Sequence, residues 1–501
     1  LINRIFVSLY IIYNKVSTYN NIIGRYIIND DDNDYDLLGQ VLNFLEKQEI
    51  KKIDLEDMMK LFEFVISPSD RIVTGAIYTP RKIRKRILES CLSNHKDLSS
   101  IRVADIACGC GGFLMDVAKY IHKKTGKSYH HIYRENIFGI DIQSYSIERC
   151  KILLNLLAIS EGENSELEFN LLNADTLDFH SGGWNSAFND FDVVVGNPPY
   201  VCGRNMGNAT KEKTKMYDVC NSGSTDLYIP FFQIAVEMLK EDGMMGYITM
   251  NTFLKSLNAR ELRSFFMNSG FDIQIIDFRG HQIFQGKSTY TCLFFLRKTQ
   301  TGMLHYYCDE KVELKKHVNF STIRYSMLDA DKGWNLNEHK TSNIIESVGV
   351  PLAKYCQSRH GIATLSNKTY IFNPIRESCD FFYLEKDNME YPIEREICKD
   401  IVNSNKLNSD KCLNDIKHKV IFPYQIQDGK AVLIDEDDMR RKFPMTYAYL
   451  VSQREILAGR DKGKGGDYPV WYAYGRTQSL VMPAVKMFFP KIANKPLHCV
   501  I

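Results

Sequence analysis

The chain has 501 residues, of which 44% are apolar and 25% charged, and its formal net charge is +2. This balance excludes a disordered, a collagen-like and a uniformly polybasic protein, and the length at roughly 150 residues per domain predicts two to four domains. Charge is uneven, because residues 411–501 hold 15 basic and 9 acidic side chains, which predicts a positive surface there. The thirteen cysteines form no CxxC pair, so the pattern indicates a reduced, cytoplasmic protein without a zinc ribbon.

The N-terminal 70 residues are predicted to form a helical segment. Leucine and valine recur at helical spacing from residue 37 onward. The apolar stretch at residues 5–12 is far shorter than the roughly 20 residues that cross a bilayer, so we expect a packed helix and no membrane association. A further helix is expected over residues 80–91, where Pro80 suits the first turn. Its basic run, RKIRKR at residues 81–86, fits either a solvated helix face or contacts with phosphate groups.

From residue 101 onward, short apolar strands alternate with helices. This alternation predicts βαβ units, a parallel sheet and a doubly wound α/β domain over residues 71–330. A polar stretch at residues 328–343 marks the expected boundary to a second domain, residues 345–501, of short strands and a helix. The expected strands lie at residues 101–106, 136–140, 167–172, 191–196, 244–250, 271–278 and 290–297, the expected helices at 113–123, 144–158 and 226–240, and a long loop at 201–225.

Three polar signals stand where the first three strands end, which is the edge where open parallel sheets bind ligands. The turn DIACGCGGFL, residues 105–114, carries glycines that permit a tight turn and close approach of a ligand. Its spacing is neither the dinucleotide fingerprint nor a P-loop, so a triphosphate is disfavoured. Asp141 fits a ribose-hydroxyl acceptor or a helix N-cap. Asp175 fits an acceptor for an adenine amino group or a simple loop carboxylate.

The sharpest signal is Asn197-Pro198-Pro199-Tyr200, directly after the apolar strand at residues 191–196. The prolines fix the backbone and remove two donors, so nearby carbonyls stay free to accept. Asn197 offers an amide oxygen whose burial would be costly without a partner, and Tyr200 offers a flat face. Together these residues predict a pocket for a planar group that bears an amino group.

These motifs resemble the S-adenosylmethionine-dependent amino-methyltransferases of DNA, in particular the TaqI-like, gamma-class adenine methyltransferases of restriction-modification systems. The resemblance covers about residues 37–501, and it departs from the usual motif at Ile106 and Cys110, where proline and serine are usual. It implies a Rossmann-like doubly wound methyltransferase sheet with an N-terminal helical segment. It also implies a C-terminal mixed α/β target-recognition domain, truncated at the end of this chain.

The resemblance assigns catalytic roles to Asn197, Pro198 and Tyr200. Asn197 and the Pro198 carbonyl would accept hydrogen bonds from the amino group of a flipped-out adenine, and Tyr200 would stack on the base. Phe284 is either the second aromatic face or a core residue. No metal is implied. The residues that the resemblance implies for S-adenosyl-L-methionine are Tyr78, Thr79, Asp105, Ala107, Gly109, Gly111, Asp141, Ile142 and Asp175.

The implied partner is double-stranded DNA, bound by a monomer that works beside a separate restriction endonuclease. Alternatives are a protein-glutamine methyltransferase, an RNA or cytosine-amino methyltransferase, and an inactive specificity module. A bifunctional restriction-methylation enzyme that lacks its nuclease part is a further alternative. The roughly 70 residues before TGAIYTP at 74–80 are too few for a nuclease domain of the usual size.

Overall fold

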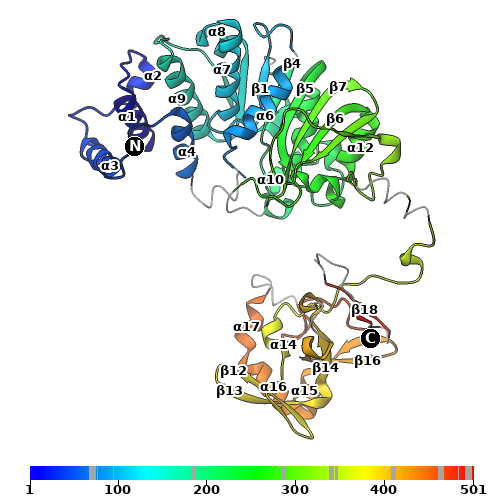
Figure 1. Cartoon of the computed structure of the whole chain (residues 1–501). Coiled ribbons are helices and arrows are strands. Elements are labelled where there is room, and N and C mark those ends of the chain that lie inside the picture. Colours follow the sequence, from blue (N-terminus) through cyan, green and yellow to red (C-terminus); the bar gives the residue numbers. More distant parts are fainter. Residues whose placement is uncertain are drawn as a thin grey trace. The chain divides into compact units, whose positions relative to one another are not determined.

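The chain forms two compact units, Leu1–Val348 and Gly349–Ile501, in a computed structural model (Figure 1). The structure describes residues 1–66, 75, 77–93, 95–182, 184, 187–284, 289–337, 344, 348–407, 413–460, 468–482, 485–490 and 499–500. No helix among these residues is long and apolar enough to cross a membrane.

A nine-stranded sheet forms the centre of the N-terminal unit. Its strands are β1 (Val103–Asp105), β2 (Ile137–Asp141), β3 (Asn170–Asn173), β4 (Phe191–Gly196), β5 (Leu239–Met250), β6 (Phe271–Asp277), β7 (Thr291–Gln300), β8 (Met303–Cys308) and β9 (Ser321–Arg324). They lie in the order β3-β2-β1-β4-β5-β7-β6-β8-β9. The first five pair in parallel, whereas β7 runs antiparallel between β5 and β6. The carboxyl ends of β1 to β4 therefore meet at one edge of the sheet.

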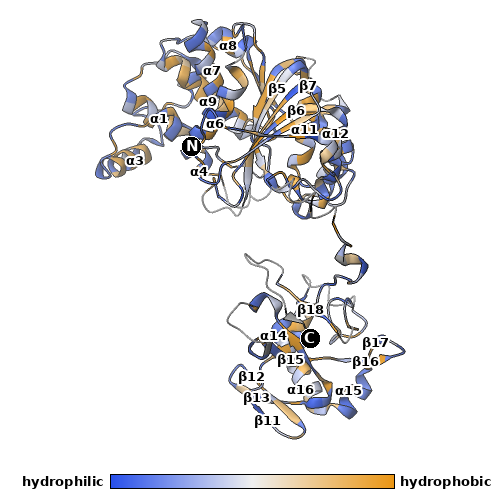
Figure 2. Ribbon diagram, turned by 45° about the vertical axis from the view of Figure 1, so that its right-hand side comes forward, coloured by the Kyte–Doolittle hydropathy of each residue, from blue (hydrophilic) through white to orange (hydrophobic). Residues whose placement is uncertain are grey.

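Helices cover both faces of this sheet. On one face lie α6 (Arg81–Leu92), α7 (Gly112–Thr125) and α9 (Ser144–Ser160), and on the other lie α11 (Tyr228–Met238) and α12 (Arg260–Ser269). Two apolar cores separate the layers, and the strands between them are predominantly hydrophobic in Figure 2. The predicted doubly wound α/β class is confirmed, and β8 and β9 extend the sheet beyond the strands that the sequence indicated.

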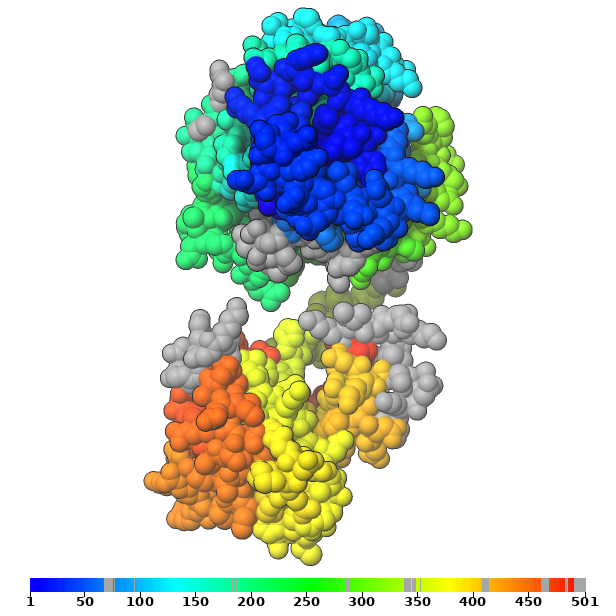
Figure 3. Space-filling view, turned by 90° about the vertical axis from the view of Figure 1, so that its left-hand side faces the viewer, coloured from blue at the N-terminus to red at the C-terminus, as the bar shows by residue number. Residues whose placement is uncertain are grey.

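The predicted N-terminal helical segment forms and packs onto the sheet domain. Its helices are α1 (Ile2–Asn14), α2 (Asn21–Gly24), α3 (Tyr35–Lys47) and α4 (Leu55–Phe64). A capping box between Asp54 and Asp57 starts α4. Asn20 is buried and donates a 2.9 Å hydrogen bond to Asn155 of α9. Figure 3 shows these helices, in dark blue, on one side of the unit. Their buried apolar side chains belong to the same hydrophobic core as those of α6, α7 and α9, so the segment has no separate core.

Several helices appear where none was expected, among them α12. α8 (Tyr129–Glu135) begins at Ser128, whose hydroxyl accepts from the His131 amide. The segment predicted as a long loop, residues 201–225, contains α10 (Asn208–Thr214). The sequence of α10, NATKEKT, has no apolar periodicity because all but its last residue lie at the surface or partly exposed. Hydrophobic periodicity therefore could not indicate α10.

The C-terminal unit is a mixed α/β body with its own core. Its elements are α14 (Asn367–Tyr370), β10 (Ile371–Phe372), β11 (Arg376–Glu377), β12 (Phe381–Lys386), β13 (Met389–Glu394), β14 (Cys398–Val402), β15 (Lys417–Ile421), β16 (Tyr424–Gln427), β17 (Lys430–Leu433), α15 (Glu436–Lys442), α16 (Pro444–Ser452), α17 (Arg454–Ala458), β18 (Met487–Phe488) and β19 (Cys499–Val500). The strands form three-stranded sheets, β10-β15-β14 and β11-β12-β13, and two-stranded sheets, β16-β17 and β18-β19.

Candidate active site

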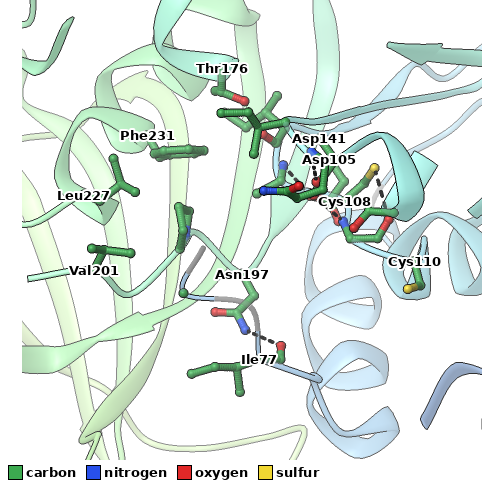
Figure 4. Close-up of a pocket in the computed structure, with 18 of the residues that line it drawn as sticks. Ile77, Asp105, Cys108, Cys110, Asp141, Thr176, Asn197, Val201, Leu227 and Phe231 are labelled. Atoms are coloured by element: carbon green, nitrogen blue, oxygen red, sulfur yellow. Dashed lines mark hydrogen bonds between the residues drawn. The ribbon is translucent and has the colours of Figure 1, made fainter. Parts of the chain in front are cut away.

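A pocket lies at the carboxyl ends of β1 to β4 (Figure 4). It brings together most of the residues that the sequence singled out, whereas Gly111, Pro198, Tyr200 and Phe284 do not line it. The predicted residues that line it are Tyr78, Thr79, Asp105, Ala107, Gly109, Asp141, Ile142, Asp175 and Asn197.

The glycine-rich turn between β1 and α7 forms the floor of this pocket. The Gly109 amide donates a 2.9 Å hydrogen bond to Asp141 Oδ2, which ties the turn to the end of β2. Gly111 has a φ of +86°, and a Cβ there would collide with the Cys150 sulfur of α9. Only glycine suits both demands at position 111, so this residue lets the turn pack closely against α9, while the Gly109 backbone lines the pocket.

Two buried carboxyls stand beside this turn. Asp105 is 2% exposed, and burial raises its pKa to about 8, with the charge of Asp141 adding to the shift. The Ala107 amide, 3.1 Å from Asp105 Oδ1, opposes it. Burial also raises the pKa of Asp141, against hydrogen bonds from the amides of Gln143 and Gly109. Both Asp141 oxygens thus already accept a backbone N–H, and the Ser146 side chain also bonds to this carboxyl, so part of its acceptor capacity is left for a ligand.

Asn197 follows β4 with its side-chain amide held in one orientation. Its Nδ2 donates to the Ile77 carbonyl at 3.3 Å and to Thr79 Oγ1 at 3.1 Å. Its Oδ1 is buried and has no hydrogen-bond partner among the described residues. An unpaired buried acceptor is costly, on the order of 1–3 kcal/mol. Such an atom at a pocket wall fits a group that donates a hydrogen bond to it (Figure 4).

The segment before α6 approaches the backbone of this motif closely. A Cβ on Gly75, whose φ is +66°, would lie 2.6 Å from the Tyr200 amide nitrogen. The Tyr200 hydroxyl donates to the Ile248 carbonyl of β5 at 3.2 Å, and burial raises its pKa well above the usual value. The Tyr200 and Phe284 rings contact each other edge-on, with centroids 6.2 Å apart and planes at 63°. Phe284 is 4% exposed and belongs to the core, so the two rings form a closed contact in this state.

Arg84 links this segment to two other helices, a role that the sequence did not indicate. Its guanidinium is 1% exposed and donates to Glu56 at 2.7 Å, Asp116 at 2.8 Å and the Thr79 carbonyl at 2.6 Å. The Tyr78 hydroxyl donates to the other Glu56 oxygen. The alternative of a solvated face for RKIRKR therefore fails at Arg84, since an ion-paired arginine can be buried where a free one cannot.

Asp175 is engaged by a residue of α10. Lys213 Nζ lies 2.7 Å from Asp175 Oδ2 and 2.7 Å from Asp178 Oδ1, while Asp175 Oδ1 accepts from the Leu177 amide. The assignment of Asp175 to an adenine amino group stays a prediction. Lys213 thus links α10, whose Thr210 lines the pocket, to both acids.

One wall of the pocket is apolar and was missed by sequence reasoning. Val201, Leu227 and Phe231 face Asp105 and Asp141 across the cavity in Figure 4. Leu227 and Phe231 are four residues apart and so lie on one helical face, and this spacing within the helix expected at residues 226–240 is the signal that could have indicated them. A planar apolar group fits this wall, and hydrogen-bonding groups fit the opposite one.

The sheet with its antiparallel β7 and the pocket at the ends of β1 to β4 define a Rossmann-like methyltransferase fold. Comparison with known proteins shows which methyltransferases the chain resembles. Residues 135–284 match the Eco57I restriction-modification methylase family. The chain is thus related to the methyltransferases of restriction-modification systems, and the resemblance expected from the sequence is confirmed at that level.

Individual proteins of restriction-modification systems are also similar to the chain. The chain is 27% identical to the type II restriction enzyme and methyltransferase RM.Eco57I of Escherichia coli, over 89% of this chain and 51% of that protein. It is 24% identical to the type II methyltransferase M.BanIII of Aneurinibacillus aneurinilyticus, over 84% and 77% of the two chains. The type IIL restriction-modification enzyme MmeI, solved in complex with DNA, shares the fold with a TM-score of 0.53 at 14% identity, over 82% and 58% of the two chains. The chain spans about half the length of the E. coli relative.

Proposed function

We propose that this chain is a site-specific DNA adenine methyltransferase that acts as the modification activity of a restriction-modification system. It transfers a methyl group from S-adenosyl-L-methionine to the exocyclic amino group of a flipped-out adenine. The observation that carries the proposal is the buried, unpaired Oδ1 of Asn197, held at the wall of a pocket by two donated hydrogen bonds. The names of the two type II relatives support a methyltransferase of a restriction-modification system, and the MmeI structure in complex with DNA supports DNA as the substrate.

The pocket fits S-adenosyl-L-methionine, which supplies an electrophilic methyl group when bound. The open glycine turn suits a ligand that must approach the backbone, and the apolar wall of Val201, Leu227 and Phe231 suits a planar base. Asp141 and Asp175 would accept from ribose and adenine groups. Asp105, at the bottom of the pocket, would accept from the polar methionine part.

Asn197 activates the target. The exocyclic nitrogen of adenine is a weak nucleophile because its lone pair is delocalised into the ring. Hydrogen bonds accepted from its two protons by Asn197 Oδ1 and the Pro198 carbonyl keep that lone pair on nitrogen. The effect is electrostatic and pre-organised, because Ile77 and Thr79 fix the amide before the base arrives.

The base must leave the duplex to reach this position, at a cost of a few kcal/mol. Stacking on Tyr200, worth about 1–3 kcal/mol per base, offsets part of that cost. Because Tyr200 and Phe284 contact each other edge-on, the base enters between them only when the rings separate. The C-terminal unit would read the target sequence.

A bifunctional restriction and modification protein is the second candidate. It is favoured by the E. coli relative, which is named both a restriction enzyme and a methyltransferase and of which this chain spans about half. In that case a nuclease would belong to the same protein. Otherwise a separate endonuclease would serve the same system, beside a methyltransferase that acts as a monomer.

The test is transfer of tritium from labelled S-adenosyl-L-methionine to unmethylated duplex DNA, RNA or cell protein. We expect label on adenine in DNA, and a loss of about 10²–10³ in kcat for Asn197→Ala. Binding of the cofactor by calorimetry should not change in that variant. Asn208→Ala, an exposed residue of α10 outside the pocket lining, is the matched control. Label on RNA or protein instead of DNA would overturn the proposal.

A further inference from the structure

A second cavity, separate from the cofactor pocket, is a groove on the face of the sheet that carries α6 and α7. The two helices pack against each other, and β6, β7 and residues 316–320 complete the groove. It shares no lining residue with the pocket at the strand ends. Its charged and imidazole side chains are Arg81, Lys85, Arg86, Glu89, Asp116, Lys119, Lys123, Lys124, Asp272, Arg297, Lys316 and His317.

The groove is strongly positive, with eight lysine and arginine side chains against three carboxylates. Two of the three carboxylates are paired with cations. Asp116 bonds to Arg84 at 2.8 Å, and Glu89 pairs with Lys316 at 3.4 Å and Lys85 at 4.0 Å. Asp272 Oδ1 lies 3.2 Å from His305 Nε2 without a hydrogen bond. Six cations of the groove have no carboxylate oxygen within 4.0 Å in the part of the chain that the structure describes: Arg81, Arg86, Lys119, Lys123, Lys124 and Arg297.

Arg86 is the least expected of these six. It is 9% exposed, its Nε has no hydrogen-bond partner among the described residues, and its Nη1 donates to the Ser90 hydroxyl. Its guanidinium carbon stands 5.9 Å from the centre of the Phe295 ring. Burial lowers its pKa, against weak opposition from the charge of Glu89. A buried arginine without an ion pair is costly, so a ligand that brings negative charge would relieve that cost.

Lys119 shows the same deficit of negative charge. It is half-buried, burial lowers its pKa, and the nearby Arg81 lowers it further against the charge of Asp116. Lys123 and Lys124 stand in the last turn of α7, where the helix dipole favours cations. The helix dipole explains a favourable position for Lys123 and Lys124 only. Lys119 and Arg86 lie in the interior of their helices, and Arg297 lies on a strand.

We propose that this groove binds a run of phosphate groups, with the phosphodiester backbone of DNA outside the methylated site as its occupant. Arginine and lysine on three elements, spread along α7 from Lys119 to Lys124, suit a linear polyanion rather than one compact ion. The length of α7 from Gly112, at the cofactor pocket, to Lys124 is roughly 18 Å at 1.5 Å per residue. The basic run RKIRKR thus contributes Arg84 to the architecture of the site and Arg86 to the groove.

The test compares the full chain with Lys123→Glu/Lys124→Glu. Both lysines are exposed, so the variant should fold, and Lys119→Met is a second variant that keeps the apolar stem. The matched control is Lys82→Glu/Lys96→Glu, two exposed lysines outside the groove with the same change in charge. One arm measures binding of a labelled duplex without a methylation site against salt concentration. The other measures binding of inorganic tripolyphosphate by calorimetry.

We expect the slope of log affinity against log salt to fall by about 2 in the double groove variant, because two phosphate contacts are lost, relative to the control. Tripolyphosphate binding should weaken in parallel. Loss of tripolyphosphate binding with an unchanged DNA slope would assign the groove to a free polyphosphate. An unchanged slope together with no difference in tripolyphosphate binding would overturn the proposal. The result does not depend on methyl transfer, and binding of S-adenosyl-L-methionine in the same variants reports on the cofactor pocket alone.

Discussion

Replacing Arg84 by methionine should destabilise the N-terminal unit and loosen the segment that orients Asn197. The guanidinium donates to carboxylates on α4 and α7 and to the Thr79 carbonyl, all within 2.8 Å. Methionine fills a similar volume but leaves Glu56 and Asp116, whose side chains are 13% and 12% exposed, without their shared cation. Removing one partner of a buried ion pair costs about 3–5 kcal/mol, and we expect a loss of that size in the free energy of unfolding.

The effect should depend on pH in a defined direction. Burial by itself would raise the pKa of Glu56, but the hydrogen bond and charge of Arg84 outweigh burial and lower it below 4.5. A lowered pKa stabilises the folded state above the unfolded pKa of 4.5, and this stabilisation disappears as the pH falls through the lowered value. The difference between wild type and Arg84→Met should therefore narrow below pH 4.5.

Urea unfolding followed by tryptophan fluorescence measures this difference. The chain has three tryptophans, and in a Trp471→Phe background the remaining two, Trp184 and Trp334, both report on the N-terminal unit. Arg84→Lys, which keeps the charge but not the forked donors, should lose less. The reasoning is refuted if Arg84→Met unfolds within about 1 kcal/mol of wild type at neutral pH, the value expected for an exposed pair.

Two further predictions follow from the carboxyls of the pocket. Because the pKa of Asp105 is raised to about 8, its protonated form is favoured in the folded state, and that stabilisation is lost as the pH rises from 3.8 to about 8. Asp105→Asn should therefore gain stability over wild type across this interval in urea titrations, and a constant difference would contradict the burial argument. Lys213→Ala should change the free energy of unfolding by less than about 1 kcal/mol, since its partners are partly exposed. It should bind S-adenosyl-L-methionine at least as tightly as wild type in calorimetry because Asp175 is released, and weaker binding would show that the lysine itself holds the cofactor.

Local patterns were enough to indicate the central architecture. Strands at residues 191–196 and 271–278 were predicted within a residue or so of β4 and β6, because continuous apolar runs between polar turns fit a sheet buried on both faces. The glycine turn and Asn197 were indicated as well, since glycine and proline restrict the backbone wherever they occur. By contrast, α10 and β9 were missed, because their residues are mostly exposed and carry no apolar period.

The sequence by itself determined which chemical groups follow the strands. A motif such as Asn197 to Tyr200 consists of residues adjacent in the chain, so its groups can be read without knowing the fold. Only the tertiary structure decided which of those groups are already engaged. Lys213 on Asp175, the closed contact of Tyr200 with Phe284, and the free Oδ1 of Asn197 join residues from different elements. The tertiary structure also decided the roles of the basic run RKIRKR. Arg84 forms ion pairs with two acids on other helices, whereas Arg86 has no acid within ion-pair distance among the described residues. Whether a buried charge is paired depends on contacts between distant segments, and these are set by packing rather than by local sequence.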